Sequence, residues 1–448
     1  MTLIGARPYN SAVDMNMKMI HTAAIHTLGC KLNQAESETL AADLVSRDVA
    51  MTSGNTADII VINTCSVTHA ADAKSRHLVR MLRALNPESV IAVTGCYAER
   101  AGQELINCGA DMVSGNRDKA TLAKSLAARL PQKSSGATAR GSGRVRSFIK
   151  IQDGCDKFCS YCIVPFVRPT IYSIDADTVV KDIRSRISDG YKEIVLTGTE
   201  IGSYFSKGLE LIGLIKLILH ETSAARLHFS SLQPQEITGE LLALWQDGRL
   251  CRHFHIALQS GSDAVLKRMG RRYTTDIFRR TVEMVRTSVP DASVTTDIIV
   301  GFPGESDEEF TNSHEFCRRM KFAALHVFPY SARPGTMAAQ MAEKVSEQIK
   351  RQRSGIMLEL AAGAADEFAA RFIDQTREVL WEKEVRQGSG IYSGLTDNYI
   401  RIYTGSSRDI TNTISRARLI GHARNSGPSF ISRSKKLKQS GLWGDLSV

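Results

Sequence analysis

The pattern of apolar and polar positions changes twice along the chain and divides it into three successive regions. Between residues 22 and 130, short apolar runs of strand length are each followed by a stretch with helical spacing. The apolar runs lie at 23–28, 58–63 and 90–94, and the helical stretches at 36–49, at 70–85 and after Tyr97. This alternation predicts an α/β domain with a parallel sheet and helices on its faces.

Strand and helix patterns alternate again between residues 147 and 375. Six runs have strand character, at 147–152, 193–197, 226–231, 253–258, 293–300 and 323–328. Six parallel strands with intervening helices predict an open (β/α)6 barrel, related to the eight-stranded barrels whose active sites lie at the carboxyl ends of the strands. A long helical pattern over residues 346–374 closes this region.

After residue 376 the pattern changes to short β runs with Gly and Asn turns, at 378–382, 390–394 and 398–403. Such spacing predicts a small β-barrel. Residues 131–146 are rich in Ser, Gly and basic residues and are typical of a linker. The predicted organisation is a disordered leader (1–21), an α/β domain (22–130), the linker (131–146), the open barrel (147–375), a small β-barrel (376–424) and a basic tail (425–448).

Composition narrows the class of protein. No apolar run approaches the ~18 residues of a membrane-spanning helix, and the first twenty residues lack the apolar core of a secretory signal. Nine cysteines in a large chain without such a signal favour metal-bound thiolates in a reducing cytosol over disulfides. The net charge of +10 favours a polyanionic partner such as nucleic acid.

Much of this charge lies near the C-terminus. Residues 376–448 contain twelve Lys and Arg but six Asp and Glu, a net charge of +6. Three tyrosines in this region, Tyr392, Tyr399 and Tyr403, could stack on bases. The alternative interpretation is an ordinary barrel core followed by a basic tail.

The strongest chemical signal is a group of three closely spaced cysteines, Cys155, Cys159 and Cys162, in a C-x₃-C-x₂-C pattern directly after a strand. Four cysteines would close a [4Fe–4S] cluster, whereas three leave one iron open. An open position is typical of a metal site that performs chemistry. A structural zinc loop is the alternative, but no second pair of zinc ligands follows in the sequence.

A second group is predicted from the topology of the first domain, in which each apolar run is followed by a cysteine: Cys30, Cys65 and Cys96. Because the carboxyl ends of parallel strands share one edge of a sheet, these side chains are expected to converge. Three buried structural cysteines are the alternative. The remaining cysteines, Cys108, Cys251 and Cys317, are predicted to be ordinary interior residues.

With these motifs in place, the C-x₃-C-x₂-C stretch resembles the radical S-adenosylmethionine (SAM) enzymes. The order of the three domains is similar to the methylthiotransferases of that superfamily, from about Thr22 to about Gly421. The segments 27–34, 63–68, 258–262 and 330–336 look like motifs of this family. The sequence Gly-Cys-Lys-Leu-Asn-Gln at 29–34 most resembles the corresponding motif of the branch that methylthiolates N6-threonylcarbamoyladenosine at position 37 of tRNA.

The resemblance implies two [4Fe–4S] clusters. The catalytic one, on Cys155, Cys159 and Cys162, would cleave SAM to a 5′-deoxyadenosyl radical. The auxiliary one would carry on its open iron the sulfur to be transferred, held by Cys30, Cys65 and Cys96. One SAM would methylate the sulfur, and a second would supply the radical that abstracts hydrogen from C2 of the adenine.

The resemblance also implies which residues contact SAM, which domain binds RNA and which partners take part. The SAM pocket is expected to include Tyr161, Gly198, Ser231, Gln259 and Gly301. The last domain would be an RNA-binding TRAM barrel. The implied partners are a tRNA anticodon loop and an electron donor such as flavodoxin or ferredoxin, with no membrane and no DNA, in the cytoplasm.

Two stretches depart from the family pattern. Where the family usually has Arg-Gly-Arg and a later Ser-Arg-Pro, residues 168–174 read Arg-Pro-Thr-Ile-Tyr-Ser-Ile, and Gln233 stands where glutamate is more usual. The alternative functions are methylthiolation of isopentenyladenosine-37 in tRNA, methylthiolation of a ribosomal-protein aspartate, and non-catalytic RNA binding by an Fe–S protein.

Overall fold

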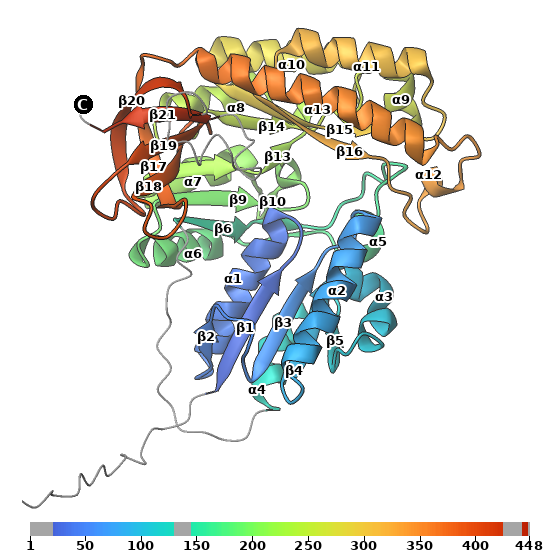
Figure 1. Ribbon diagram of the computed structural model, residues 1–448, viewed down its shortest axis with the longest axis vertical. Helices are drawn as coiled ribbons and strands as arrows, with labels where there is room; N and C mark the ends of the chain where they lie inside the picture. Colours follow the sequence, from blue (N-terminus) through green and yellow to red (C-terminus); the bar gives the residue numbers. More distant parts are fainter. Residues whose placement is uncertain (1–20, 130–144, 424–440, 447–448) are drawn as a thin grey trace, which may run out of the picture.

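The computed structural model describes residues 21–129, 145–423 and 441–446 (Figure 1). Outside the described residues lie the predicted leader except His21, the predicted linker except residues 145–146, and the predicted tail except residues 441–446. Within the described part of the chain, no helix is both long and apolar enough to cross a membrane.

The N-terminal domain is a five-stranded parallel sheet in the order β2-β1-β3-β4-β5. Its three central strands confirm the predicted apolar runs, whereas β2 and β5 are short edge strands that the pattern did not reveal. The strands are β1 (Thr22–Thr27), β2 (Ala50–Thr52), β3 (Ile59–Thr64), β4 (Val90–Gly95) and β5 (Met112–Ser114). The helices are α1 (Lys31–Val45), α2 (His69–Leu85), α3 (Cys96–Ile106) and α4 (Leu122–Ala127).

Helices cover both faces of this sheet, as the alternation predicted. Leucines of α1 and α4 pack on one face, while α2 and α3 pack on the other. The central strand β3 is buried along its whole length, which explains its continuous apolar run. Each fully buried Ile or Val side chain contributes roughly 1.5–3 kcal/mol.

The second domain is the predicted open six-stranded barrel. Two parallel sheets, β12-β9-β6 and β13-β14-β15-β16, are joined where the chain passes from β12 to β13, and these two short strands together form the third of the six predicted strands. The strands are β6 (Arg146–Lys150), β9 (Glu193–Thr197), β12 (Arg226–Phe229), β13 (Ser231–Leu232), β14 (His253–Ile256), β15 (Ser293–Val300) and β16 (Ala324–Pro329). Two short antiparallel pairs lie in the loops: β7 (Gln152–Asp153) with β8 (Tyr172–Ser173), and β10 (Phe205–Ser206) with β11 (Leu209–Glu210).

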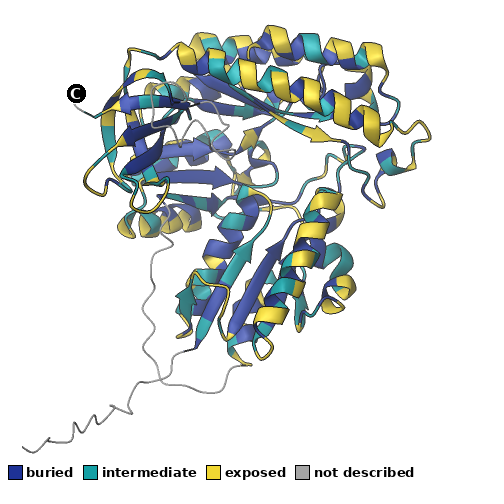
Figure 2. Ribbon diagram, in the orientation of Figure 1, coloured by how far each residue is buried: buried dark blue, intermediate teal, exposed yellow. Residues whose placement is uncertain are grey.

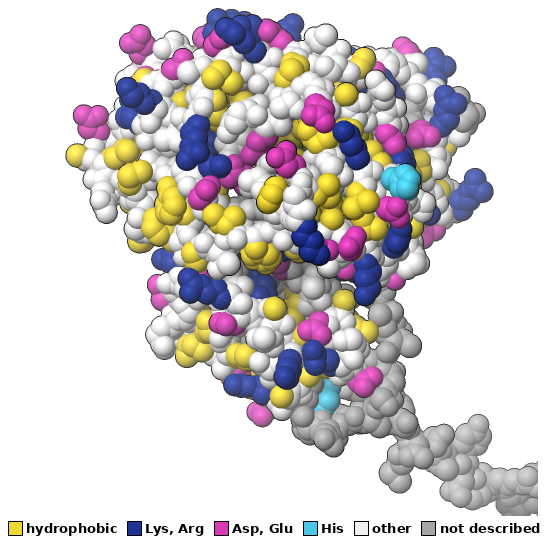
Figure 3. All heavy atoms as spheres, turned by 180° about the vertical axis from the view of Figure 1, so that it is seen from behind, with side chains coloured by type: hydrophobic (Ala, Val, Ile, Leu, Met, Phe, Trp, Pro, Cys, Tyr) yellow, Lys and Arg dark blue, Asp and Glu magenta, His cyan; other side chains and the backbone are white. Residues whose placement is uncertain are grey.

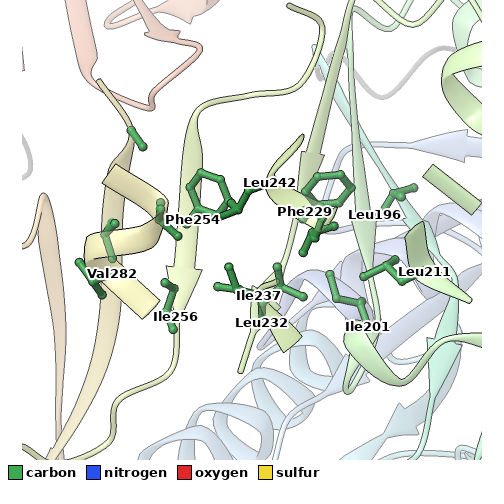
Figure 4. Close-up of a cluster of buried hydrophobic side chains, with 14 of the residues drawn as sticks. Leu196, Ile201, Leu211, Phe229, Leu232, Ile237, Leu242, Phe254, Ile256 and Val282 are labelled. Carbon is green, nitrogen blue, oxygen red and sulfur yellow. The ribbon is translucent and has the colours of Figure 1, made fainter. Parts of the chain in front are cut away.

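Helices surround the barrel and bury the largest hydrophobic core of the molecule, part of which is shown in Figure 4. Figure 2 shows that the barrel strands are largely buried, while the outer helices expose one face to solvent. The helices are α5 (Val164–Val167), α6 (Ala176–Ser188), α7 (Leu211–Glu221), α8 (Gly239–Ala243), α9 (Asp263–Arg268), α10 (Thr275–Ser288), α11 (Asp307–Met320), α12 (Met337–Gln340) and α13 (Glu347–Ala370).

Local sequence fixes where these helices begin and which side they bury. The Thr274 hydroxyl accepts a hydrogen bond from the backbone N–H of Ile277 at the start of α10. Apolar residues spaced by four and three, Phe278, Val282 and Val285, then face the core. Helix α11 begins with a capping box in which Ser306 and Glu309 bond each other's backbone N–H groups.

The barrel is open between β6 and β16, and two helices flank the opening. Helix α1 of the N-terminal domain packs against β6, and α13 packs against β16. In Figure 1 the N-terminal domain lies below the barrel, with α1 reaching toward β6. The first residues of α1 therefore lie at the side entrance of the barrel.

The last domain is a closed barrel in the order β17-β18-β19-β21-β20. Its strands are β17 (Thr376–Glu384), β18 (Ile391–Thr396), β19 (Arg401–Gly405), β20 (Ile414–His422) and β21 (Gly441–Asp445). Part of the predicted basic tail is therefore the strand β21, because Leu442 is fully buried in the barrel core.

Charge is distributed unevenly between the described and remaining residues. Ten of the 57 Lys and Arg residues, but one of the 47 Asp and Glu residues, lie in 1–20, 130–144 and 424–440. The described residues are thus almost neutral in sum. On the face drawn in Figure 3, basic and acidic side chains are accordingly interspersed.

Candidate functional site

A large cavity of about 1300 Å³ lies where the N-terminal sheet meets the barrel. Side chains from all three domains line it. The lining includes all six predicted cluster ligands: Cys30, Cys65, Cys96, Cys155, Cys159 and Cys162. The structure therefore brings these cysteines together, and their role as ligands stays a prediction.

The N-terminal cysteines are assembled by the sheet. Cys30 and Cys65 follow the neighbouring strands β1 and β3, and Cys96 begins the helix after β4. Gly29 has a φ of +100°, and a Cβ there would come within 2.6 Å of the Cβ of Cys65. Glycine at this position therefore allows the two cysteines to approach each other.

Asn33 ties these strand ends together, a role that the sequence did not reveal. Its side-chain amide Nδ2 donates to the carbonyl oxygens of Leu28, at 2.8 Å, and Thr64, at 2.9 Å. The backbone oxygen of Asn33 accepts a hydrogen bond from Asn63 Nδ2 at 2.9 Å. The only available signal was its place in the segment 27–34.

The barrel cysteines are instead held by one loop, whose base is the β7–β8 pair. Gly154 has a φ of +77°, and a Cβ there would lie 2.3 Å from the carbonyl oxygen of Thr170. Within the loop, the backbone N–H of Cys162 donates to the carbonyl oxygen of Cys159 at 2.9 Å. The loop can therefore present its cysteines without help from another domain.

Two charged side chains contact the barrel thiols and explain the glutamine at 233. Glu200 Oε2 lies 3.2 Å from Cys155 Sγ, and Arg271 Nη1 donates to Cys159 Sγ at 3.3 Å. Gln233 lies between them, donating from Nε2 to Glu200 at 2.7 Å and accepting from Arg271 at 3.2 Å. An ionised glutamate at 233 could accept from Arg271 but could not donate to Glu200.

Burial raises the pKa of four of the six cysteine thiols. It raises the pKa of Cys65 and Cys155 to about 12 and that of Cys162 to about 11, and it also raises the pKa of Cys30. These groups therefore stay protonated without metal at neutral pH. Because metals bind thiolates, loading the site releases protons.

The two cysteine groups are neighbours across the domain interface. Cys96, of the N-terminal group, packs against Ile163 and Val167 of the barrel. Asn116 Nδ2 lies 3.9 Å from Cys96 Sγ and donates to the carbonyl oxygen of Val167 at 2.8 Å. One ligand bound in the cavity can therefore contact both groups.

A buried ion network locks the two domains beside the cysteines. Arg168, which matches the family pattern, contacts Glu36 Oε1 at 2.8 Å, Asp153 Oδ1 at 2.9 Å and Asn33 Oδ1 at 3.2 Å. Lys119 contacts Glu36 Oε2 at 2.5 Å. Burial would raise the pKa of Glu36, but the charges of Lys119 and Arg168 outweigh it and lower that pKa.

A second lock lies on the other side of the interface. Arg333, in the predicted family segment 330–336, contacts Asp72 Oδ2 at 2.7 Å and donates to the carbonyl oxygen of Ser66 at 3.2 Å. Arg100 also contacts Asp72 Oδ2, at 2.8 Å. Because Ser66 directly follows Cys65, this lock places the barrel next to the N-terminal cysteines.

The predicted SAM contacts are mostly found in the cavity wall, which includes Tyr161, Gly198, Ser231 and Gln259. Gly301 differs, because it faces α13 and a Cβ there would lie 2.2 Å from Lys350 Cγ. Its N–H donates to Glu305 Oε2 at 2.6 Å, and Glu305 pairs with buried Arg353. Gly301 is therefore not among the described residues that line the cavity, and its contact with SAM stays a prediction.

The cavity continues into the barrel, where its wall is polar. His253 Nε2 and His255 Nδ1 lie 3.0 and 2.9 Å from Thr295 Oγ1. His255 Nε2 lies 3.3 Å from Asp297 Oδ2, and His326 packs against His255. We call these five residues the polar chamber. Alternate positions on β14 and β15 face inward, so the His-x-His and Thr-x-Asp patterns were the missed signal.

The C-terminal barrel closes the far end of the chamber with Tyr399. This ring stacks on His253 with centroids 4.6 Å apart, and its hydroxyl bonds Glu193 and lies 3.0 Å from His228 Nδ1. Burial lowers the pKa of His228 and His253 well below the usual value, so both are neutral.

This placement corrects the expectation that the C-terminal tyrosines stack on bases. Tyr399 packs inside the open barrel, and Tyr392 and Tyr403 are buried in the core of the small barrel. Cys108, Cys251 and Cys317 are likewise buried, as predicted.

The donor set fits Fe–S clusters better than a single ion. Among the described residues, no three His, Cys, Asp or Glu side chains are grouped to hold one metal ion. A [4Fe–4S] cluster has a different requirement, because its thiolate ligands bind different irons. Each group offers three soft thiol ligands and no fourth, which suits iron–sulfur binding with one open iron.

Comparisons with known proteins match both cysteine groups. The Radical SAM superfamily matches residues 149–317, and the uncharacterized protein family UPF0004 matches residues 22–115. The first region contains the barrel cysteines, and the second contains the N-terminal cysteines.

Whole-chain relatives extend this match. The chain is 34% identical to threonylcarbamoyladenosine tRNA methylthiotransferase MtaB of Bacillus subtilis, over 91% of this chain and 96% of that protein. It is 36% identical to MtaB of Thermotoga maritima, over 85% and 90%. It is 32% identical to tRNA-2-methylthio-N(6)-dimethylallyladenosine synthase of Endomicrobium trichonymphae, over 86% and 94%.

Among solved structures, the chain resembles the radical SAM methyltransferase TsrM from Kitasatospora setae, a structure with cobalamin and a [4Fe–4S] cluster bound. The TM-score is 0.52 at 13% identity, and the match covers 84% of this chain and 81% of that one. This likeness concerns the fold alone.

Proposed function

The chain belongs to the methylthiotransferases of the radical SAM superfamily, and on this premise we propose that it installs a methylthio group at C2 of N6-threonylcarbamoyladenosine at position 37 of tRNA. It is a transferase that uses two [4Fe–4S] clusters and SAM. The observation that carries the proposal is the cavity shared by two cysteine groups from two domains.

The two cysteine groups have separate roles in this proposal. Cys155, Cys159 and Cys162 hold one cluster, and Cys30, Cys65 and Cys96 hold the other. When bound, the clusters and SAM supply the electron, radical and sulfur chemistry that amino-acid side chains lack. The protein positions these groups around one substrate site, and the two buried arginine locks keep the cysteine groups at a fixed separation.

Side chains beside the barrel cysteines tune that group. Arg271 donates to Cys159 Sγ, while Glu200 is held beside Cys155 by Gln233. Tyr161, Gly198, Ser231 and Gln259 are proposed to contact SAM, since they line the same cavity as the barrel cysteines.

The polar chamber supports a threonylcarbamoyl group over an isopentenyl group on N6 of the adenine. An isopentenyl chain is best placed against apolar side chains, because burying the chamber's polar groups beneath it would leave them without water. The histidines, Thr295 and Asp297 can instead hydrogen-bond ureido, hydroxyl and carboxylate groups.

We further propose that the substrate is an anticodon loop and that the electron donor is a flavodoxin or ferredoxin in the cytoplasm. A base in a single-stranded loop is more easily turned out into such a cavity than a paired base. Five Lys and Arg and no acidic residues occur in 424–440, between β20 and β21. These residues can supply sequence-independent affinity for the tRNA backbone.

Mass spectrometry of tRNA nucleosides tests the proposal. Purified protein with both clusters loaded is incubated with SAM, a reductant and anticodon stem-loops containing N6-threonylcarbamoyladenosine or isopentenyladenosine. We expect the 2-methylthio product from the first substrate. Product from isopentenyladenosine alone would assign the other tRNA branch, and SAM cleavage without any methylthio-RNA would contradict the proposed substrate class.

A further inference from the structure

Lys31 differs from the other basic residues of the cavity in having no partner. Five Lys and Arg side chains line the cavity: Lys31, Lys157, Arg168, Arg271 and Arg401. The last four contact carboxylate, amide or thiol groups. Lys31 makes no hydrogen bond or ion pair with any of the described residues, although it is only partly exposed.

Lys31 lines the same cavity as the five residues of the polar chamber. It begins α1, the helix that packs at the side opening of the barrel. The charges of Glu193 and Asp297 act on it, and its charge acts on His253 and His326. The N-terminal domain therefore contributes one positive charge to the chamber.

Both nearby carboxylates contact other groups, although Glu193 Oε2 has no hydrogen-bond partner among the described residues. Glu193 accepts a hydrogen bond from the Tyr399 hydroxyl, and Asp297 contacts His255. A half-buried ammonium group without a bonded partner favours an incoming anion, because both charges gain from being paired away from water.

We propose that Lys31 binds the carboxylate of the threonylcarbamoyl group and is the residue that selects the acidic base for reaction. The inference rests on the proposed function and deepens it. A threonylcarbamoyl group carries one carboxylate, which matches the single unpaired ammonium of the cavity. An isopentenyl group has no charge for Lys31 to bind.

This contact also orients the base. Lys31 directly follows Cys30 in the chain and lines the same cavity, so a carboxylate bound to it lies no further than about one lysine side chain from the backbone that carries Cys30. On the adenine ring, C2 and C6 are both bonded to N1, so anchoring the N6 group constrains where the C2 edge lies. Lys31 thus favours a pose in which C2 faces the region between the cysteine groups.

The experiment compares three anticodon stem-loops that differ only at position 37. One contains N6-threonylcarbamoyladenosine, the second contains its neutral carboxyl methyl ester, and the third contains adenosine. Binding to protein with both clusters loaded is measured by fluorescence anisotropy without SAM or reductant. Methylthio product from the acid is measured separately with SAM and reductant.

The variants are Lys31→Gln, which removes the charge, and Lys31→Arg, which keeps it. Lys216→Gln on the exposed side of α7 is the matched control for loss of one positive charge, since its partner Glu240 is also exposed. Iron content and the visible absorption of each preparation check that both clusters are present.

Wild-type protein is expected to bind the acid roughly 10- to 100-fold more tightly than the ester, the range of a charge-assisted hydrogen bond. Lys31→Gln should lose this preference while binding the adenosine stem-loop as wild type does. Lys31→Arg should keep most of it, and Lys216→Gln all of it.

Two results would overturn the inference. The first is equal binding of acid and ester by wild-type protein, a comparison that needs no variant. The second is a Lys31→Gln protein that still discriminates between them, or that loses affinity equally for all three RNAs, as a phosphate contact would. Failure of the proposed function is distinguishable, because wild-type protein would then form no methylthio product from the acid.

Discussion

The two cysteine groups face the same cavity but are built in opposite ways. The barrel group lies within one loop, closed at its base by β7 and β8. The N-terminal group comes from three strand ends and exists only when the register of β1, β3 and β4 is correct. The comparison teaches that a local loop and a whole sheet can each present three thiols to one cavity, and that different substitutions are expected to disrupt the two groups.

The largest effect is expected from removing the barrel group. Replacing Cys155, Cys159 and Cys162 with Ala should leave about four of about eight irons, because only the other group can still bind a cluster. Cleavage of SAM to 5′-deoxyadenosine should fall to background. Iron analysis and chromatography of the products measure both quantities, and unchanged iron would show that the loop is not a ligand group.

Removing the N-terminal cysteine group should separate SAM cleavage from formation of the methylthio product. With Cys30, Cys65 and Cys96 replaced by Ala, about four irons should again remain, but SAM cleavage should persist because the barrel loop is intact. Methylthio product should disappear. Normal product formation by this variant would assign these cysteines a structural role only.

A single glycine tests how the sheet-built group depends on geometry. Gly29→Ala should reduce occupancy of the N-terminal cluster, because the new Cβ would meet Cys65 within 2.6 Å in a backbone conformation that alanine disfavours. Gly208→Ala is the matched control, since Gly208 also has a positive φ but has no neighbour within 4 Å.

Iron content and SAM cleavage of these two variants give the comparison. Gly29→Ala should lose iron while keeping SAM cleavage, and Gly208→Ala should keep both. Equal iron in the two variants would mean that the close approach of Cys30 and Cys65 is not needed for the cluster.

The smallest effect is expected from weakening the buried ion network between the N-terminal domain and the barrel. Glu36→Gln should lower stability by roughly 3 kcal/mol, because Lys119 and Arg168 would lose the main carboxylate between them while remaining buried. Thermal unfolding should show a lower midpoint. Glu240→Gln, an exposed residue paired with Lys216, should leave the midpoint almost unchanged.

The strands and the convergence of the cysteines were predictable because both depend on simple periodicity. Continuous apolar runs mark buried parallel strands, and topology then brings Cys30, Cys65 and Cys96 to one edge. The six strands of the open barrel were found for the same reason. The edge strands β2 and β5 were missed because a strand of three residues gives too short a pattern.

The rest of the site depends on packing between distant segments. Nothing near Tyr399 indicates that it enters another domain, and nothing near Gly301 indicates that Lys350 of α13 covers it. Lys31 was visible only as part of a motif, because its lack of a partner is a property of the assembled cavity. Such features arise from tertiary contacts and have no local pattern.

Most of the net positive charge lies in 1–20, 130–144 and 424–440, whereas the described residues are nearly neutral. Replacing a basic residue in these segments changes the net charge of the chain without altering any of the described residues. Over evolution, affinity for a polyanion can therefore drift or be selected with little pleiotropic effect on folding or on the cysteine groups. The same separation lets an engineer adjust RNA affinity and reaction chemistry as independent traits.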